Sequence, residues 1–481
     1  MSSPNTSNLK PQTSNLEDTI CALATAPGGA IGMIRVSGPK AFDAVSAICS
    51  VRCAECAANT VHFTHVIDKT SNLKPQTSNH IDEVLVSVFR APHSYTGEDS
   101  VEISCHGSRY ILNKVLELLI ANGCRMANPG EYTMRAYLNG KMDLSQAEAV
   151  ADLIASSNKA THQMAMSQLR GQFSSKLSQL REQLLKLTSL LELELDFSDH
   201  EDLEFADRKE LLELAKTIDK HITSLAHSFE TGQALKHGIP VAIVGKTNVG
   251  KSTLLNALLK DDRAIVSDIH GTTRDTIEDT IDIQGVTFRF IDTAGIRQTT
   301  DAVEQIGIER TYATIDKARI VLWLIDAQPN AEEIKEMQER CKDKSLIIII
   351  NKIDKSGSEI KFSNLKTQTS NLKTQNSNLL SISAKKSIGL DTLEAAIYQA
   401  ANIPTISNTD VIVSNARHYD ALVRAHESLN RVLEGMDQQL SGDLLSEDLR
   451  LTLDTLSEIT GGQITPNEVL GNIFKNFCVG K

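Results

Sequence analysis

The feature that most limits the fold of this 481-residue chain is a glycine-rich loop at residues 245–252, which reads Gly-Lys-Thr-Asn-Val-Gly-Lys-Ser. An apolar run over residues 241–244 precedes the loop, and a leucine-rich segment over residues 254–259 follows it. This order predicts a strand, a loop and a helix, which is the context in which such a loop binds phosphate. Backbone N–H groups and the start of the helix would face the phosphate oxygens. We therefore expect an α/β nucleotide-binding domain, with Lys251 at the β- and γ-phosphates and Ser252 on Mg²⁺.

Further motifs indicate that the nucleotide carries guanine. Residues 292–295 (Asp-Thr-Ala-Gly) follow a strand predicted over residues 288–291 (Phe-Arg-Phe-Ile), and their aspartate would hold Mg²⁺ through water. Residues 351–354 (Asn-Lys-Ile-Asp) follow a second apolar run, and their carboxylate can accept two hydrogen bonds that guanine donates and adenine cannot. Residues 383–385 (Ser-Ala-Lys) would close the base pocket, and Thr273 is the expected second side-chain ligand of Mg²⁺. Gly271-Thr272-Thr273 lies between the phosphate loop and residues 292–295, and these five motifs in their order along the chain predict GTP binding.

The group that would position water for hydrolysis is not the glutamine of a Ras-like GTPase. Ile296 occupies that place, and its alkyl side chain cannot orient water. Glu304 is the candidate from the residues alone, and its other interpretation is an exposed charge in a switch region. Asn248 offers a carbonyl oxygen that can hold a monovalent cation beside the phosphates, and its other interpretation is an ordinary turn asparagine.

Length and composition predict about three domains in a cytoplasmic protein. The chain is 41% hydrophobic but has no apolar run that would span a bilayer, and its polar N-terminus lacks the pattern of a signal peptide. Eight scattered cysteines favour a reducing compartment. Cys49, Cys53 and Cys56 resemble half of a zinc site, but no second ligand pair follows, so zinc is disfavoured. The net charge of −12 means that an RNA partner would need a local basic patch or another subunit.

A polar decapeptide repeat interrupts the chain. Residues 6–15 recur at residues 70–79, and two degenerate copies run through residues 363–378. Because the repeat has no helical or strand period and cannot bury a core, we interpret the copies as insertions into surface loops. Deletion of residues 363–378 is therefore expected to leave GTP affinity intact.

Hydrophobic periodicity predicts two kinds of structure around the nucleotide motifs. Residues 18–143 alternate short strands with turns and contain one apolar helix over residues 111–119, which predicts an α+β domain. Helical patterns then cover a leucine face and three later segments: Leu177, Leu180, Leu184, Leu187 and Leu191, and residues 208–229, 413–440 and 446–459. The leucine face favours a bundle core over a partner seam. The nucleotide domain is thus predicted to be inserted into a helical domain.

The two ends of the chain resemble one family of GTPases. The chain finishes Phe-Cys-Val-Gly-Lys at residues 477–481. Four motifs nearer the start are Ile-Gly-Met-Ile-Arg-Val-Ser-Gly (31–38), Ser-Tyr-Thr-Gly-Glu-Asp (94–99), Pro-Gly-Glu-Tyr-Thr (129–133) and Arg-Ala-Tyr-Leu-Asn-Gly-Lys (135–141). Apart from the repeats, essentially the whole chain resembles the MnmE/TrmE family of tRNA wobble-uridine modification GTPases. The alternative is a ribosome-assembly GTPase that acts as a regulatory switch, which would lack the terminal motif; a structural scaffold would not explain the nucleotide site.

The resemblance implies a multidomain fold. Residues 1–143 would form an α+β tetrahydrofolate-binding and dimerisation domain. Residues 144–235 and 406–481 would form the two segments of an all-α helical domain. Residues 236–405 would form an inserted Ras-like α/β GTPase domain.

The resemblance also implies an activity and its partners. The chain would be a potassium-dependent GTP hydrolase that, with a flavin-dependent partner subunit, adds a carboxymethylaminomethyl or aminomethyl group to carbon 5 of the tRNA wobble uridine. A 5-formyl- or methylene-tetrahydrofolate would supply the one-carbon unit, Mg²⁺ and K⁺ would act at the nucleotide, and FAD would be bound by the partner only. A cytoplasmic homodimer would join the partner in a heterotetramer with no membrane contact.

Site residues follow from the motifs and the resemblance together. Glu304 and Lys251 are the implied catalytic residues, and the role of Cys478 is left open. Ser252 and Thr273 are the expected Mg²⁺ ligands, and the implied K⁺ ligands are Asn248, Ser267, Ile269 and Thr272. The implied folate-binding residues are Arg35, Glu102, Lys141 and Lys481. The GTP-binding residues are Asn248, Val249, Gly250, Lys251, Ser252, Thr253, Ser267, Asp268, Ile269, His270, Gly271, Thr272, Thr273, Asp292, Thr293, Ala294, Gly295, Asn351, Lys352, Ile353, Asp354, Ser383, Ala384 and Lys385.

Overall fold

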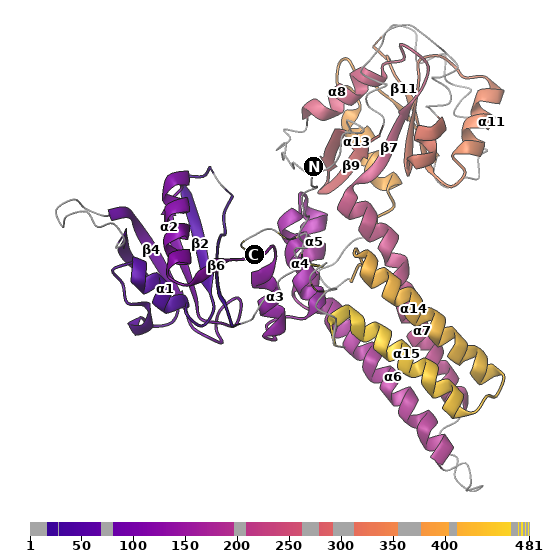
Figure 1. Cartoon of the computed structure of the whole chain (residues 1–481). Coiled ribbons are helices and arrows are strands. Elements are labelled where there is room, and N and C mark those ends of the chain that lie inside the picture. Colours follow the sequence, from indigo (N-terminus) through magenta and orange to yellow (C-terminus); the bar gives the residue numbers. More distant parts are fainter. Residues whose placement is uncertain are drawn as a thin grey trace, which may run out of the picture. The chain divides into compact units, whose positions relative to one another are not determined.

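The structure of the chain is a computed structural model (Figure 1), and its internal contacts divide it into two units. It describes residues 17–26, 28–68, 80–196, 208–261, 279–291, 312–354, 377–403, 411–462, 470, 473–474, 477 and 480. The first unit comprises residues 1–155, 168–218 and 427–481, and the second comprises residues 156–167 and 219–426. Each unit contains one six-stranded sheet.

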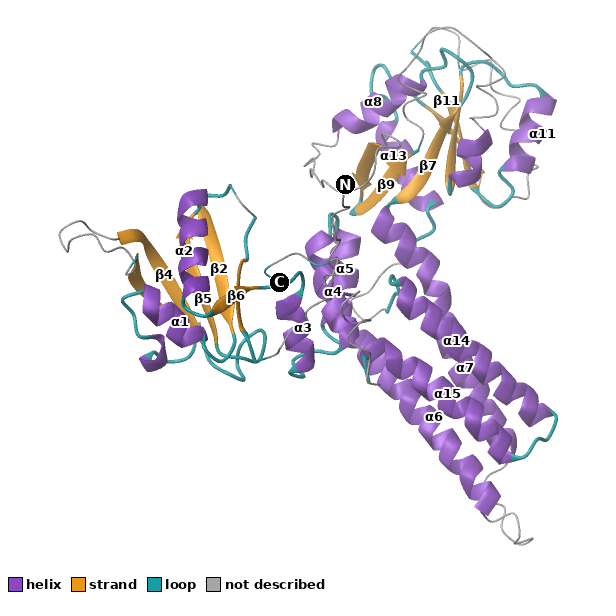
Figure 2. Ribbon diagram, viewed as in Figure 1, coloured by secondary structure: helices purple, strands orange, loops and turns teal. Residues whose placement is uncertain are grey.

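The sheet of the first unit has the strand order β3-β4-β5-β2-β1-β6. Its strands are β1 (Thr19–Leu23), β2 (Ile31–Ser37), β3 (Thr60–Ile67), β4 (His80–Phe89), β5 (Ser100–His106) and β6 (Cys124–Met126). All neighbours are antiparallel except β1 and β6. Alternate residues of these strands form a buried core with two helices, α1 (Ala41–Ile48) and α2 (Arg109–Ala121), on one face of the sheet (Figure 2). The periodicity predicted α2, whereas the short helix α1 was not expected.

The helical part of the first unit begins after the sheet. It contains α3 (Glu131–Leu138), α4 (Leu144–Ala155), α6 (Gln172–Asp196) and α15 (Gly442–Thr460), and α15 packs along α6. The leucine face predicted for residues 177–191 lies on α6, and all five leucines are buried. Leucine spacings of three and four place these side chains on one side of the helix, so burial of this stripe stabilises the bundle.

The sheet of the second unit has the strand order β12-β11-β10-β7-β9-β8. Its strands are β7 (Ile239–Val244), β8 (Asp279–Ile283), β9 (Val286–Phe290), β10 (Ile320–Ile325), β11 (Ser345–Ile350) and β12 (Ser377–Ser381). Only β8 runs antiparallel to its neighbour. Central strands β10 and β11 are almost continuously apolar because both faces of a parallel sheet are covered. On β10, Trp323 is buried and pairs in register with Val244 of β7.

Helices surround this second sheet and connect it to the rest of the chain. Those within the unit are α8 (Lys251–Asp261), α11 (Ala331–Arg340) and α13 (Leu390–Ala400). Three more helices contribute residues to both units: α5 (Lys159–Leu169), α7 (Arg208–His237) and α14 (Ala416–Asp437). None of the described helices is long and apolar enough to cross a membrane.

One end of the repeat region has regular structure. The last two residues of the copy at residues 363–378, Ser377 and Asn378, begin β12 and pair with Leu346 and Ile347 of β11. The interpretation of this whole segment as a loop insertion is therefore wrong for these two residues. Backbone pairing at the edge of a sheet requires no apolar side chains, so hydrophobic periodicity could not reveal it.

Candidate functional sites

The glycine-rich loop connects β7 to α8, as the sequence predicted. Gly245 has a φ of 150°, and a Cβ atom there would lie 2.4 Å from the carbonyl oxygen of Leu324. Gly250 has a φ of 106°, and a Cβ atom there would lie 2.4 Å from Nδ2 of Asn351. Because only glycine tolerates both the backbone conformation and the close approach, the loop can wrap tightly around a phosphate.

Lys251, the first residue of α8, folds its side chain back over this loop. Its Nζ donates to the carbonyl oxygens of Gly245, at 2.7 Å, and Lys246, at 2.9 Å. Burial lowers the pKa of Lys251, because it disfavours the charged form. Phosphate oxygens would provide the same ammonium with stronger, charged acceptors than these two carbonyls.

The amide of Asn351 joins three of the predicted motifs. Its Nδ2 donates to the carbonyl oxygen of Val249 at 2.9 Å, and its Oδ1 accepts from the backbone N–H of Ala384 at 3.1 Å. Asn351 is buried, so both bonds are shielded from water. The motif after β11 thus fixes both the phosphate loop and the loop after β12.

Asp354 and Ser383 form the part of the site expected to recognise the base. Ser383 Oγ donates to Asp354 Oδ1 at 2.7 Å. This hydrogen bond, with smaller contributions from Lys386 and Lys385, lowers the pKa of Asp354, so its carboxylate is ionised at neutral pH. An ionised carboxylate is an acceptor only, which suits the paired N–H donors of guanine.

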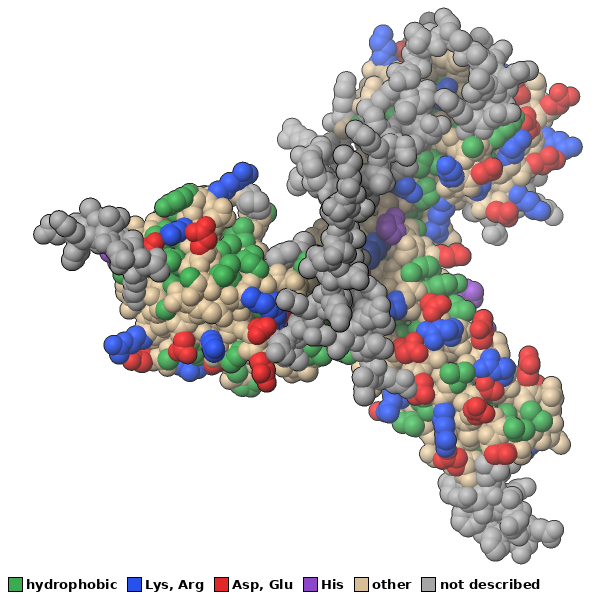
Figure 3. Space-filling model, viewed as in Figure 1, with side chains coloured by type: hydrophobic (Ala, Val, Ile, Leu, Met, Phe, Trp, Pro, Cys, Tyr) green, Lys and Arg blue, Asp and Glu red, His purple; other side chains and the backbone are tan. Residues whose placement is uncertain are grey.

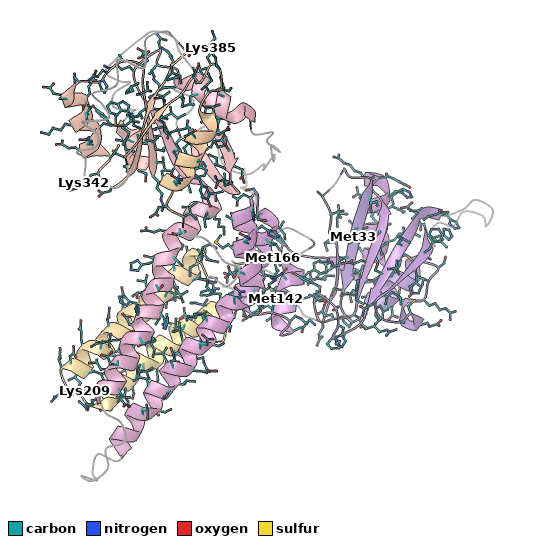
Figure 4. All side chains as sticks on the ribbon, turned by 180° about the vertical axis from the view of Figure 1, so that it is seen from behind. Met33, Met142, Met166, Lys209, Lys342 and Lys385 are labelled. Atoms are coloured by element: carbon teal, nitrogen blue, oxygen red, sulfur yellow. The ribbon has the colours of Figure 1, made fainter. Side chains whose placement is uncertain are left out.

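Lys352 and Asn248 are held together at the same end of the sheet. Lys352 Nζ donates to the backbone carbonyl oxygen of Asn248 at 2.6 Å and lies 2.7 Å from Asp326 Oδ2. Asn248 has a left-handed backbone with a φ of 60°, and its side chain is exposed. Exposure leaves the amide oxygen open to solvent and to a cation. Lys385 is also exposed, at the edge of the second unit (Figure 4).

Many of the predicted site residues lie outside the described part of the chain. These are Ser267, Asp268, Ile269, His270, Gly271, Thr272, Thr273, Asp292, Thr293, Ala294, Gly295, Glu304, Cys478 and Lys481. Of the expected Mg²⁺ ligands, the half-buried Ser252 is described, beside Thr253 in the first turn of α8. Within the described ranges, no three His, Cys, Asp or Glu side chains are grouped to hold a metal ion.

A second polar site lies on the sheet of the first unit. Arg35 of β2 is opposite Glu102 of β5 in the strand register. Its Nε and Nη2 both donate to Glu102 Oε1, at 2.9 Å and 2.7 Å. The residues on either side of both side chains are buried in the core beneath the helices. Since side chains alternate along a strand, Arg35 and Glu102 point to the other face, which also carries Met33 (Figure 4).

Two tyrosines flank the guanidinium of Arg35. The rings of Tyr95 and Tyr132 lie 5.4 Å and 5.6 Å from its Cζ, which is within range for cation–π attraction. Tyr132 Oη also donates to the backbone carbonyl oxygen of Arg35 at 2.7 Å. A small cavity of about 70 Å³ adjoins these groups and is lined by Arg35, Phe89, Tyr95, Thr96, Ser100 and Glu102. Sequence reasoning did not assign the tyrosines, although both belong to motifs that carried the resemblance.

A buried ion network supports the turn that carries Tyr95. Arg135 is fully buried, and its Nη2 donates to Glu131 Oε1 at 3.0 Å while its Nη1 donates to Glu98 Oε1 at 3.1 Å. Glu98 also accepts from Ser37 Oγ at 2.8 Å. These charge-assisted bonds fix the 94–99 turn against the end of β2.

Gly480 also lies at this second site. Arg35 Nη1 lies 3.4 Å from the carbonyl oxygen of Gly480. A Cβ atom at Gly480, whose φ is 96°, would lie 2.3 Å from the carbonyl oxygen of Leu23. Lys141 is placed differently, because its exposed Nζ donates to the Pro92 carbonyl oxygen at 2.8 Å. The structure thus brings Arg35, Glu102 and Gly480 together, whereas Lys141 packs near Gly97 and directs its Nζ to Pro92.

The fold and the loop after β7 define a multidomain phosphate-loop nucleotide-binding protein. Comparison with known families identifies the family of the chain. The family model described as the GTP-binding protein TrmE N-terminus matches residues 19–141, and the MnmE helical domain matches residues 144–478. This chain belongs to the MnmE family of tRNA modification GTPases. The predicted fold class, an α+β N-terminal domain, a helical domain and an inserted α/β GTPase domain, is confirmed.

Individual relatives are similar along nearly their full length. The tRNA modification GTPase MnmE of Phocaeicola vulgatus is 55% identical, over 97% of this chain and 99% of the relative. The MnmE of Bacteroides thetaiotaomicron is 54% identical, over 97% of this chain and 100% of the relative. Among solved structures, a single-residue variant of Aquifex aeolicus Era bound to GDP.AlF4- is 30% identical over 39% of this chain and 66% of that one, with a TM-score of 0.27.

Proposed function

We propose that this chain is a potassium-dependent GTP hydrolase that works with a flavin-dependent partner to modify carbon 5 of the tRNA wobble uridine. A tetrahydrofolate would supply the one-carbon unit when bound. The observation that carries the proposal is the approach of Gly480, in the Cys-x-Gly-Lys terminus, to the Arg35–Glu102 pair. A GTPase that acts only as a switch has no need to hold the glycine of this motif at a second polar site.

The described nucleotide site fits GTP with Mg²⁺ and K⁺. The glycines leave a backbone cradle without room for side chains, and Lys251 places an ammonium over it. Ser252 would ligate Mg²⁺ together with Thr273, and Asn248 would hold K⁺ together with the 267–272 segment, since hydroxyl and carbonyl oxygens suit both ions. These ions would stabilise the charge that develops on the phosphates, while Glu304 would orient the attacking water.

The donors and acceptors of the first-unit site fit a folate, although the closed space there is small. Arg35 occupies Glu102 Oε1, so Oε2 is the oxygen that would accept from the paired N–H groups of a pteridine. Tyr95 and Phe89 offer flat apolar surface beside it. A ligand-sized pocket is roughly 300–1,000 Å³. The cavity of about 70 Å³ would therefore hold only one edge of the ligand, with Lys141 and Lys481 proposed to bind it farther out.

The surfaces are consistent with the proposed cytoplasmic homodimer and its partners. On β3 and β4, Val61, Phe63 and Leu85 are exposed by 61%, 64% and 47%. A neighbouring subunit would shield these apolar side chains.

Acidic and basic side chains are interspersed on the face shown in Figure 3. A chain of net charge −12 would therefore share the tRNA with its flavin-dependent partner in a heterotetramer. We propose four domain segments: the N-terminal domain (residues 1–143), the first helical segment (144–235), the GTPase domain (236–405) and the second helical segment (406–481).

Mass spectrometry of nucleosides from total tRNA tests this function. Three strains would be compared: one without the protein, one with the intact chain and one with a chain that lacks Lys481. We expect the carbon-5 aminomethyl uridines to disappear without the protein and to return only with the intact chain. Unchanged nucleosides in all three strains would overturn the proposal, and ribosomal particle profiles would then test the switch alternative.

A further inference from the structure

Residues at the start of α5 are hydrogen-bonded to the β8–β9 turn and to β9 itself. Asn158 Nδ2 donates to Thr287 Oγ1 at 2.7 Å. The backbone N–H of Ala160 donates to the carbonyl oxygen of Gly285 at 3.0 Å. Residues 156–167 group with the second unit by their contacts, although in sequence they belong to the predicted helical segment 144–235. A piece of the helical segment is thus built into the nucleotide domain.

This contact is tight on both sides. Gly285 has a φ of 83°, and a Cβ atom there would lie 2.9 Å from Cβ of Lys159. Asn158 is 9% exposed, and its Oδ1 accepts from the N–H of Thr161 at 2.8 Å, which caps α5. Ala160 is buried in the same core as Phe288 of β9. One amide therefore fixes the helix start and the strand at once.

In sequence, β8 and β9 lie between two segments that are predicted to contact the nucleotide and its Mg²⁺. β8 begins directly after the 262–278 segment, which carries the predicted Mg²⁺ ligand Thr273, and β9 ends just before the Asp292 motif. Both segments carry sequence motifs that, in GTPases, contact the γ-phosphate or its Mg²⁺. The hairpin is the covalent link between them, and α5 leads in sequence toward α6 of the bundle.

We propose that the Asn158–Thr287 contact, with the Ala160–Gly285 bond, is a coupling clamp that makes the start of α5 respond to the bound nucleotide. The proposal rests on the proposed GTP site of this chain. Because these bonds join the start of α5 to the β8–β9 hairpin, a nucleotide that shifts β8 and β9 would also shift the start of α5. Without the side-chain bond, one backbone bond remains, and the two elements can shift separately.

Hydrogen exchange on the full chain tests the clamp. Amide exchange of residues 159–167 would be compared with GDP and with a non-hydrolysable GTP analogue. In the wild type we expect the two nucleotides to change the exchange rates by about tenfold, a typical coupling factor. Thr287→Val removes the acceptor with little change in shape and should abolish this difference, and so should Asn158→Ala. Asn158→Ala also removes the Oδ1 acceptor that caps α5, so the double variant should behave like Asn158→Ala alone.

A matched control and a second readout separate coupling from stability. Thr280→Val makes the same substitution at an exposed position of β8 and should keep the nucleotide response. GTP hydrolysis by Thr287→Val should stay within about twofold of the wild type, since the site itself is untouched. Two results would overturn the clamp: α5 amides that ignore the nucleotide in the wild type, or a Thr287→Val response equal to that of the wild type.

The proposed function and the coupling clamp are tested by different measurements, so that one can fail without the other. If tRNA nucleosides are unchanged without the protein while the α5 amides still respond to nucleotide, only the modification activity is wrong. If the amides do not respond while the nucleosides require the protein, only the clamp is wrong.

Discussion

The two polar sites of this molecule are built in different ways. The nucleotide site lies in the second unit, on loops that follow β7, β11 and β12, all parallel strands. The Arg35–Glu102 site lies in the first unit, on facing residues of the antiparallel strands β2 and β5. Loops at the carboxyl ends of parallel strands converge by topology, whereas two side chains in the middle of strands meet only if the register is right. The first design tolerates changes between its motifs, and the second does not.

The largest expected effect belongs to the loop-built site. Lys251→Met should reduce the GTP hydrolysis rate by about 1,000-fold, because it removes a fixed charge at the transferred phosphate. Lys246→Met is the matched control in the same loop, where the ammonium pairs with Glu333 at 2.7 Å and is mostly exposed. Exposed pairs contribute little, so this variant should stay within about twofold. Steady-state phosphate release measures both, and equal losses would mean that Lys251 acts only on loop structure.

The next effect concerns base recognition. Asp354→Asn should weaken GTP binding by about 100-fold, because an amide offers one acceptor where guanine needs two. Because the pKa of Asp354 is lowered, the wild-type carboxylate stays ionised as the pH falls, and affinity is lost only below the usual aspartate range. Ser383→Ala removes the main cause of that shift and should move the loss to higher pH. Fluorescent-nucleotide titrations from pH 7 downward check this, and identical pH profiles would contradict it.

A smaller effect is expected at the Arg35–Glu102 site. Glu102→Gln should lower tRNA modification by about tenfold, because a hydrogen-bonded charge pair is broken, while GTP hydrolysis stays unchanged. Glu55→Gln is the control, since its ion pair with Arg52 is exposed on both sides. Nucleoside mass spectrometry and phosphate release are measured on the same preparations. Parallel loss of both activities would show that the two sites are not independent.

The smallest effect concerns the repeat that lies, in sequence, between residues 354 and 383. Deletion of residues 363–376 should leave GTP affinity within about twofold, since the repeat is predicted to be a loop insertion and long loops cost little to shorten. Deletion of residues 363–378 removes two residues of β12 as well and should lower the free energy of unfolding by about 1–2 kcal/mol through lost backbone hydrogen bonds. Urea denaturation of both variants measures the difference. Equal stability would show that the pairing of Ser377 and Asn378 contributes nothing.

The same contrast explains what the sequence could predict. The order of the strand–loop motifs placed Val249, Asn351 and Ala384 at one end of a sheet, and the structure shows their hydrogen bonds. The pairing of Arg35 with Glu102, 67 residues apart, depends on register, which no local pattern encodes. The resemblance named these two residues, but not the tyrosines that flank Arg35. The α1 helix was missed because its eight residues are too few for a clear period.

The single tryptophan of the chain makes intrinsic tryptophan fluorescence a signal of the second unit alone. Trp323 is buried on β10, in register with the residue that precedes the phosphate loop. Indole emission from the intact chain therefore comes entirely from the second unit, while far-ultraviolet circular dichroism sums the helices of both. If the two units unfold separately, the two signals will give different midpoints in one titration, without any label or truncation.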